Sequence, residues 1–295
     1  MMLEALAPAK INLYLDVLDK MENGYHNIES VMQSISLCDK VSLEISNIEG
    51  ENLIEILSNS RAIPNDKGNL VYKAARGYID TALESRGISI LGKRLTFIIE
   101  KNIPIGAGMA GGSSDCAAAL KLMNMAFGLF NESELLSIGV NIGADVCFCL
   151  TGGTAICRGI GEKITPIKPL KDVFLVSAID NSSISTPQAF KLLDEIYGTD
   201  CLPSGNIEKM ICAIEAENLK EIAASLYNKF EVPISSENDN IPLIKNILIE
   251  NGALGALMSG SGPSVFGIFE SEKDALNAYK ALKAKKINAF LCKTI

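Results

Sequence analysis

Four glycines and two serines are concentrated in residues 104–114, which read PIGAGMAGGSS. This glycine loop follows a β-favouring stretch at residues 95–100 and precedes a run rich in Ala, Leu and Met with strong helix propensity. Glycines let backbone N–H groups approach a ligand closely, and the start of a helix adds unpaired donors and a partial positive charge. The combination is typical of an anion site, and phosphate is the usual occupant.

The glycine loop is open to other interpretations. Its glycines could serve only to cap the helix, with a Ser or Asp of residues 113–115 as the capping side chain. The string GAGMAG also fits a dinucleotide fingerprint, but the acidic residue expected at the end of the next strand is missing because residues 123–130 still resemble a helix. No HRD or DFG string follows, as a protein kinase would need, and the Walker-like residues 87–93 precede Arg94 instead of Ser or Thr. The pattern therefore favours a phosphate site of another kind.

Two charged side chains, Lys10 and Asp145, occupy positions that allow either a structural or a chemical role. Lys10 lies in a strand predicted over residues 1–18, where an ordinary solvated lysine is the simplest interpretation. Asp145 stands between a glycine-containing turn and the apolar residues 146–150, which we predict to form a buried strand. A carboxylate in such surroundings is usually a cap or a salt-bridge partner, and a catalytic group is the alternative.

Tyr25 and His26 directly follow a strong turn signal, Asn23 and Gly24. His26 is the single histidine of the chain. It could be a structural residue at a loop tip, or the aromatic ring and the imidazole could stack on a planar ligand and hydrogen-bond to it.

Composition limits the classes of function. The 295 residues carry 27 basic and 35 acidic side chains, a net charge of −8, which disfavours nucleic-acid binding. A single histidine, and eight cysteines without a CxxC pair, argue against a zinc site. Cysteines scattered in apolar runs fit a reducing cytoplasm. The start of the chain lacks a basic leader, and no run of 18 apolar residues occurs, so neither a secretory signal nor a membrane span is expected.

The predicted elements divide into two sets. The first set consists of strands at 1–18, 31–37, 40–46, 52–58, 95–100 and 154–157, and helices at 70–87, 113–130 and 131–139. After a Pro- and Lys-containing boundary at 166–171, the second set consists of strands at 173–178, 253–258, 264–269 and 289–292, and helices at 186–197, 207–230, 242–252 and 272–285. Strand–helix–strand–strand–helix–strand is a ferredoxin-like order. We therefore expect an α+β protein with two domains, residues 1–165 and 166–295.

Three motifs in this order resemble the GHMP small-molecule kinase superfamily. They are PAKINLYL at residues 8–15, PIGAGMAGGSSDCAAAL at 104–120 and MSGSGPSVFG at 258–267. The resemblance implies an N-terminal domain like the second domain of ribosomal protein S5, a ferredoxin-like C-terminal domain, and ATP with Mg²⁺ as cofactors. NGYH, IGADV, GGTAICRGIGE and STPQAF are similar to the branch that phosphorylates the 2-hydroxyl of a cytidine-diphosphate-linked methylerythritol in isoprenoid precursor synthesis.

The resemblance also implies roles for individual residues. Lys10 and Asp145 correspond to a catalytic pair, Tyr25 and His26 to residues that hold the cytosine ring, and Asn12 to a polar contact with the substrate. The ATP phosphate loop corresponds to Pro104, Ile105, Gly106, Ala107, Gly108, Met109, Ala110, Gly111, Gly112, Ser113 and Ser114. The metal ligands are not identified.

Three expectations complete the prediction. The family often has proline after Ala-Asp-Val, where this chain has Cys147. The resemblance therefore does not predict the conformation of the turn at this position. The small-molecule substrate is the expected partner, with the chain acting as a monomer or homodimer and without nucleic acid or membrane. The alternatives are another GHMP kinase, acting on homoserine, mevalonate or a sugar, and a non-catalytic ATP-binding protein on the same fold.

Overall fold

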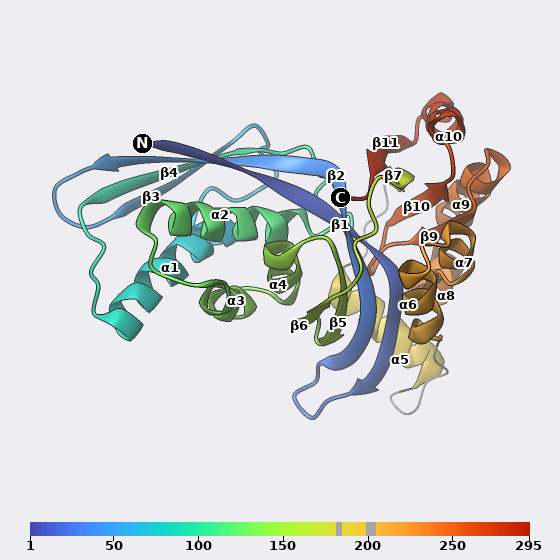
Figure 1. The fold of residues 1–295 in the computed structure, drawn as a ribbon, viewed down its shortest axis with the longest axis horizontal. Helices are drawn as coiled ribbons and strands as arrows, with labels where there is room; N and C mark the ends of the chain where they lie inside the picture. Colours follow the sequence, from blue (N-terminus) through green and yellow to red (C-terminus); the bar gives the residue numbers. More distant parts are fainter. Residues whose placement is uncertain (181–184, 199–204) are drawn as a thin grey trace. The chain divides into compact units, whose positions relative to one another are not determined.

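The computed structural model describes residues 1–180, 185–198 and 205–295 (Figure 1). The chain forms two compact units, each built from stretches that are not contiguous in sequence. Unit 1 consists of Met1–Ala9, Cys38–Ile105 and Ala110–Thr151, and unit 2 of Lys10–Leu37, Gly106–Met109 and Gly152–Ile295. The domains expected from sequence follow chain order instead, and that division at residues 165 and 166 stays a prediction.

Unit 1 is a layer of strands with helices on one face (Figure 1). Its strands are parts of β1 (Met2–Lys20) and β2 (His26–Asn47), together with β3 (Leu53–Ser58) and β4 (Lys93–Glu100). Its helices are α1 (Leu70–Arg86), α2 (Gly111–Phe127), α3 (Glu132–Val140) and α4 (Ala144–Thr151). β4 pairs antiparallel with β2 and parallel with β3. The two strands expected at 31–37 and 40–46 form one continuous strand, because β2 runs through both ranges without a break.

Local sequence signals explain why these elements form. In β4 the alternating residues Leu95, Phe97 and Ile99 are buried, as a half-buried strand requires. α1 begins after Asn69, whose side chain accepts a hydrogen bond from the first turn, and ends at Gly87, which has φ +64°. Both ends agree with the helix predicted over residues 70–87.

The buried strand predicted after Asp145 is wrong, because these residues form α4. Asp145 lies in the first turn of this helix, and the apolar side chains that follow it pack α4 against α2 and α3. A run of five apolar residues buries equally well as a strand or a helix, so its periodicity could not decide between them. The strand expected at 154–157 is confirmed as β5 (Thr154–Gly159), which pairs antiparallel with β2 and with β6 (Lys163–Pro166).

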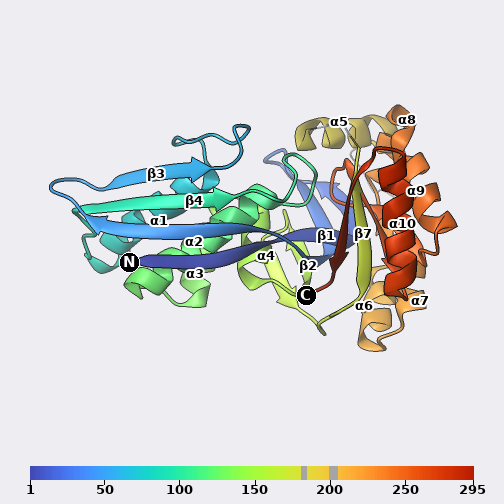
Figure 2. The ribbon, with the colours of Figure 1, turned by 90° about the horizontal axis from the view of Figure 1, so that it is seen from above.

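Unit 2 contains a four-stranded antiparallel sheet in the order β11-β7-β10-β9. These strands are β7 (Phe174–Ile179), β9 (Gly255–Met258), β10 (Ser264–Phe269) and β11 (Asn288–Lys293). Numbered by their order in the chain, they lie as 4-1-3-2, the ferredoxin-like arrangement that the sequence predicted. Figure 2 shows α9 (Asn240–Glu250) and α10 (Glu272–Ala284) along one face of this sheet. The core between them contains buried side chains such as Val176, Val265 and Leu282.

The remaining helices of unit 2 agree with prediction only in part. α5 (Thr186–Tyr197) has the span predicted at 186–197, and the side chain of Ser185 caps it. The helix expected over 207–230 is divided into α6 (Ile207–Glu215) and α7 (Leu219–Ala224), because Glu217 adopts φ +53° and Asn218 caps a new helix. They are followed by β8 (Tyr227–Asn228), which pairs with β1, and α8 (Glu231–Glu237). Within the described ranges, no helix is long and apolar enough to cross a membrane.

Candidate active site

The start of α2 in unit 1 carries donors that no capping side chain occupies. The helix begins at Gly111, and its N-cap, Ala110, has φ +56° and makes no side-chain cap hydrogen bond. The interpretation in which a Ser or Asp of residues 113–115 caps the helix is therefore wrong, and the Ser114 hydroxyl donates to the Pro8 carbonyl oxygen instead, at 2.7 Å. An uncapped helix start presents N–H groups and a partial positive charge, which suits an anion.

Gly108, in the part of the glycine loop that belongs to unit 2, packs against a second glycine-containing loop, residues 259–262. A Cβ atom on Gly108 would lie 2.8 Å from the Gly262 carbonyl oxygen and 2.9 Å from that of Ser259. A Cβ on Gly260 would lie 3.0 Å from the Gly108 carbonyl oxygen. The two backbones thus approach at a distance that only glycine permits.

Asn228 holds the second loop from β8. Its side-chain amide donates to the carbonyl oxygens of Met258, at 2.7 Å, and Gly260, at 2.8 Å. The side chain is buried, so both hydrogen bonds are shielded from water. Asn228 therefore fixes the backbone against which Gly108 packs.

Lys10 is a buried residue, with 4 % exposure, and not the solvated lysine of the simplest interpretation. Its ammonium group donates to Asn12 Oδ1 at 2.7 Å, and Asn12 Nδ2 donates to Ser30 Oγ at 2.8 Å. Ser30 Oγ in turn donates to the Tyr14 carbonyl oxygen at 2.6 Å. This chain of hydrogen bonds fixes the position of the Lys10 ammonium within unit 2. Asn12, expected to contact substrate, is here a partner of Lys10.

Tyr25 and His26 differ in their surroundings although they are neighbours. Tyr25 is 61 % exposed, whereas His26 is 8 % exposed. The His26 ring stacks on Phe190, with centroids 4.7 Å apart and planes at 15°, and its Nε2 lies 2.8 Å from Asp194 Oδ1. An exposed tyrosine beside a fixed imidazole is compatible with holding a planar ligand.

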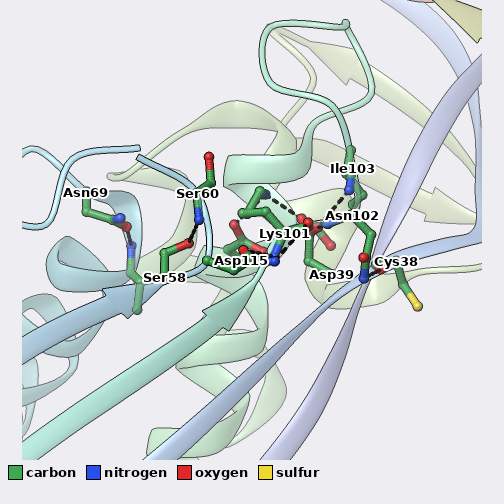
Figure 3. Close-up of polar contacts among 12 residues, drawn as sticks. Cys38, Asp39, Ser58, Ser60, Asn69, Lys101, Asn102, Ile103 and Asp115 are labelled. Atoms are coloured by element: carbon green, nitrogen blue, oxygen red, sulfur yellow. Dashed lines mark hydrogen bonds and ion pairs between the residues drawn. The ribbon is translucent and has the colours of Figure 1, made fainter. Parts of the chain in front are cut away.

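A buried group of three charged side chains joins the segment before the glycine loop to α2 in unit 1 (Figure 3). The Lys101 ammonium pairs with Asp39 and with Asp115, whose Oδ2 lies 2.7 Å away. Asp39 Oδ1 also accepts hydrogen bonds from the backbone N–H groups of Asn102, at 2.5 Å, and Ile103, at 2.8 Å. This triad of Asp39, Lys101 and Asp115 anchors the residues immediately before Pro104 to the second turn of α2.

Burial raises the pKa of Asp115 to about 7, with the attraction of Lys101 opposing the shift and the repulsion of Asp39 adding to it. The folded-state pKa therefore lies above the unfolded value of about 3.9. The folded state holds the proton more tightly, so this carboxyl's contribution to stability is present at low pH and falls as pH rises from about 4 to about 7.

Asp115→Asn is accordingly expected to stabilise the fold more at high pH than at low pH. Asparagine does not titrate, and its amide can accept from Lys101 and donate to Asp39 without a second buried negative charge. Thermal unfolding followed by circular dichroism at roughly pH 5.5 and pH 8 would measure the change, since the Asp115 carboxyl titrates between these values. Asp80→Asn, on the surface of α1, is the matched control and should not alter the pH dependence. A stability difference between Asp115→Asn and the parent chain that stayed constant with pH would contradict the assignment.

Lys10 and Asp145 belong to different units, and their expected pairing stays a prediction. Lys10 is in unit 2, and Asp145 is in unit 1, half-buried in the first turn of α4. In the described part of the chain, no three His, Cys, Asp or Glu side chains converge as a metal cage would require.

Several residues of the candidate site had no signal of their own in the sequence. Phe190 and Asp194 lie in α5, far along the chain from His26, and Asn228 lies in a two-residue strand. Ser30 and Lys101 resemble ordinary surface residues of a strand and a loop. Of these regions, the sequence singled out one, the STPQAF string that contains Phe190 and resembles the family.

Family models match both halves of the chain. The model of the GHMP kinases N terminal domain matches residues 69–153, which include the glycine loop and Asp145. The model of the GHMP kinases C terminal domain matches residues 210–288, which include the second loop at 259–262. Together they cover more than half of the chain.

Curated relatives match almost the whole chain. The 4-diphosphocytidyl-2-C-methyl-D-erythritol kinase of Clostridium tetani is 42% identical over 290 residues, covering 98% of this chain and 99% of the relative. The enzyme of the same name from Caldicellulosiruptor bescii is 45% identical over 278 residues, covering 94% and 93%.

Solved structures show the same fold. The crystal structure of a 4-(cytidine 5'-diphospho)-2C-methyl-D-erythritol kinase has a TM-score of 0.80 at 27% identity and covers 99% of both chains. Homoserine kinase from Cytophaga hutchinsonii has a TM-score of 0.77 at 19% identity, covering 100% of this chain and 94% of that one, and shows the fold alone. The α+β architecture is that of the two-domain kinases with an S5-like first domain and a ferredoxin-like second domain. The chain belongs to the GHMP kinases, a family of ATP-dependent small-molecule kinases.

Proposed function

We propose that this chain transfers the γ-phosphoryl group of ATP to the 2-hydroxyl of 4-diphosphocytidyl-2-C-methyl-D-erythritol, a step in the non-mevalonate synthesis of isoprenoid precursors. The observation that carries the proposal is near-full-length identity of 42% and 45% to two enzymes of that name. The fold does not choose the acceptor, because homoserine kinase shares it at 19% identity and mevalonate kinase at 18%.

Phosphoryl transfer depends mainly on alignment and on charge stabilisation. Residues 104–114 hold the ATP phosphates through backbone N–H groups, supported by the uncapped start of α2. Lys10, fixed through Asn12 and Ser30, offsets negative charge on the transferring phosphoryl group. Asp145 accepts the proton of the attacking hydroxyl.

Mg²⁺ is part of the proposal and fits the side chains present. Phosphoryl-transfer sites hold this ion with one or two carboxylates or hydroxyls, and with phosphate oxygens and water. The donors in the described residues suit that arrangement, since they include Asp145 and the hydroxyls of Ser113 and Ser114 but no cage of three ligands. When bound, the ion would neutralise charge developing between the β- and γ-phosphates.

An assay with the purified chain tests the proposed function. ADP release would be measured with ATP and, in turn, diphosphocytidyl methylerythritol, homoserine and mevalonate, and mass spectrometry would identify the phosphorylated product. Turnover with the cytidine-bearing acceptor supports the proposal. Preference for another acceptor would replace it with a different GHMP kinase activity, and no ADP release with any acceptor would favour a non-catalytic ATP-binding protein.

Tyr25→Ala is expected to raise the KM for the cytidine-bearing acceptor by roughly 10- to 100-fold, the range that base–aromatic stacking supports. The ring is 61 % exposed in the free protein, so the loss reflects ligand stacking and not a damaged core. The KM for ATP should stay unchanged, and Glu22→Ala, an exposed change in the same turn, should behave like the parent chain. An unchanged acceptor KM in Tyr25→Ala would remove this residue from the acceptor site.

The proposal includes a cytoplasmic location and a monomer or homodimer. Cys38, Cys116, Cys212 and Cys292 carry free thiols, whereas Cys201 lies outside the described ranges. Free thiols of this kind are typical of a reducing compartment. Analytical ultracentrifugation would distinguish one chain from two.

A further inference from the structure

β9 is the last strand of its sheet in the described part of the chain, so one edge of its backbone faces no neighbouring strand there. Met258, its final residue, is fully buried, and its backbone N–H and carbonyl groups need partners. Two side chains from one short stretch supply them. Asn228 donates to the Met258 carbonyl oxygen at 2.7 Å, and Glu231 Oε2 accepts from the Met258 N–H at 2.8 Å. Together they replace a partner strand.

The Glu231 carboxylate serves two donors at once. Its Oε2 accepts from the Met258 N–H, and its Oε1 pairs with the Lys245 ammonium from α9. The glutamate and lysine side chains are 18 % and 29 % exposed, so most of this contact is shielded from water. A carboxylate presents acceptors on both oxygens, whereas an amide presents one acceptor and one donor group. Glutamate therefore suits two donors at this position, and glutamine does not.

The two hydrogen bonds to Met258 fix successive peptide planes. The N–H belongs to the plane before this residue, which Glu231 holds, and the carbonyl group belongs to the plane after it, which Asn228 holds. Orienting both planes fixes the backbone dihedrals φ and ψ of Met258. These dihedrals set the direction in which the chain leaves β9 and enters residues 259–262.

The loop at residues 259–262 has little room to change direction. Its first carbonyl oxygen, that of Ser259, would lie 2.9 Å from a Cβ on Gly108. The Ser259 hydroxyl also accepts from the Asn12 backbone N–H at 3.1 Å, so the same residue contacts β1. A rotation at Met258 would therefore move Ser259 relative to both the glycine loop and β1.

We propose that Glu231 is a positioning residue for the ATP phosphate loop, which it aligns through the Met258 N–H and the loop at 259–262. Glu231 does not itself touch ATP. Lys245 contributes by engaging one carboxylate oxygen, so that the other faces the Met258 N–H. The proposal rests on the proposed function for the role of residues 104–114 in holding phosphate.

Glu231→Gln should disturb the second loop, because an amide cannot serve both donors. The Lys245 ammonium attracts the amide oxygen, which turns the amide NH₂ group toward the Met258 N–H. Adding Lys245→Met frees the oxygen for Met258, so the double variant should recover. Recovery by a second substitution separates positioning from simple damage to α8, because two independent destabilising changes would add.

Amide hydrogen exchange of the labelled full chain reads the Met258 N–H without any activity. This group should exchange slowly in the parent chain, roughly 10-fold faster in Glu231→Gln, and slowly again in the double variant. Glu250→Gln, an exposed change of the same charge at the end of α9, should match the parent. Equal exchange rates in Glu231→Gln and the parent chain would overturn the proposal.

Affinity for ATP tests the link from this contact to phosphate binding. Calorimetry with a non-hydrolysable ATP analogue and Mg²⁺ should give a dissociation constant about 10-fold higher for Glu231→Gln, as for a buried donor left unpaired. The double variant should lie within about 3-fold of the parent chain. The KM for ATP should rise in parallel, while the KM for the acceptor stays unchanged. A double variant as weak as Glu231→Gln would overturn the proposal.

The two proposals fail in different ways, because binding of the analogue requires no acceptor. A parent chain that binds the analogue but phosphorylates no acceptor would reject the proposed function, and the comparison of variants would still decide the role of Glu231. A Glu231→Gln variant that binds the analogue as tightly as the parent would reject the positioning role, even with full turnover of the cytidine-bearing acceptor. A parent chain that binds no analogue would reject both.

Discussion

Asp145→Asn is expected to lower kcat by roughly 100-fold or more, because an amide cannot accept the proton of the attacking hydroxyl. Asp145 lies in the first turn of α4, half-buried beside the apolar side chains that pack this helix against α2 and α3. The substitution keeps the shape of the side chain and should leave the helix in place. ATP binding should change little, since the phosphates are assigned to the glycine loop.

Steady-state ADP release would give kcat for this variant, and calorimetry with a non-hydrolysable ATP analogue would give the binding constant. Asp80→Asn, an exposed carboxylate change on α1, is the control for loss of charge in the same unit. If Lys10 and Asp145 act together, Lys10→Met combined with Asp145→Asn should be little worse than the poorer single variant. A kcat near that of the parent chain, with ATP binding unchanged, would remove Asp145 from the mechanism.

The parts of the fold that sequence predicted correctly are those with a strong local period or cap. β4 alternates buried and less buried residues, and α1 has Asn69 at its start and Gly87 at its end. Residues 146–150 lacked both signals, and their helical state depends on packing against α2 and α3, which a single segment does not encode. Likewise, the break between α6 and α7 depends on one residue, Glu217, in an uncommon backbone conformation.

The candidate site shows the same division between local and distant information. The glycine loop was recognisable because a phosphate-binding backbone needs particular residue types at close spacing. The side chains that hold it were not recognisable, because Asn228 and Lys101 act through contacts with segments distant in sequence. The burial of Lys10 was missed for a similar reason, since its partners, Asn12 and Ser30, form a pair only when β1 and β2 are placed together.

The packing of the two glycine loops leads to the second large expected effect. Gly108→Ala should lower kcat/KM for ATP by roughly 100-fold, as expected when a phosphate-binding backbone moves by about 1 Å. The new Cβ would lie 2.8 Å and 2.9 Å from the carbonyl oxygens of Gly262 and Ser259, which is too close for any real contact. The carbonyl groups of Gly262 and Ser259 cannot shift freely to make room. Asn228 hydrogen-bonds to the carbonyl oxygens of Met258 and Gly260 in the same loop and fixes its backbone.

Gly106→Ala separates this contact from backbone strain. Gly106 and Gly108 have almost the same φ, +71° and +70°, so alanine carries a similar penalty of about 1–2 kcal/mol at both positions. A Cβ on Gly106, however, would meet no heavy atom within 4 Å. Initial rates at varied ATP, with circular dichroism to confirm that both variants fold, should therefore show a much larger loss for Gly108→Ala. Equal losses would mean that strain alone matters and that the second loop does not position the first.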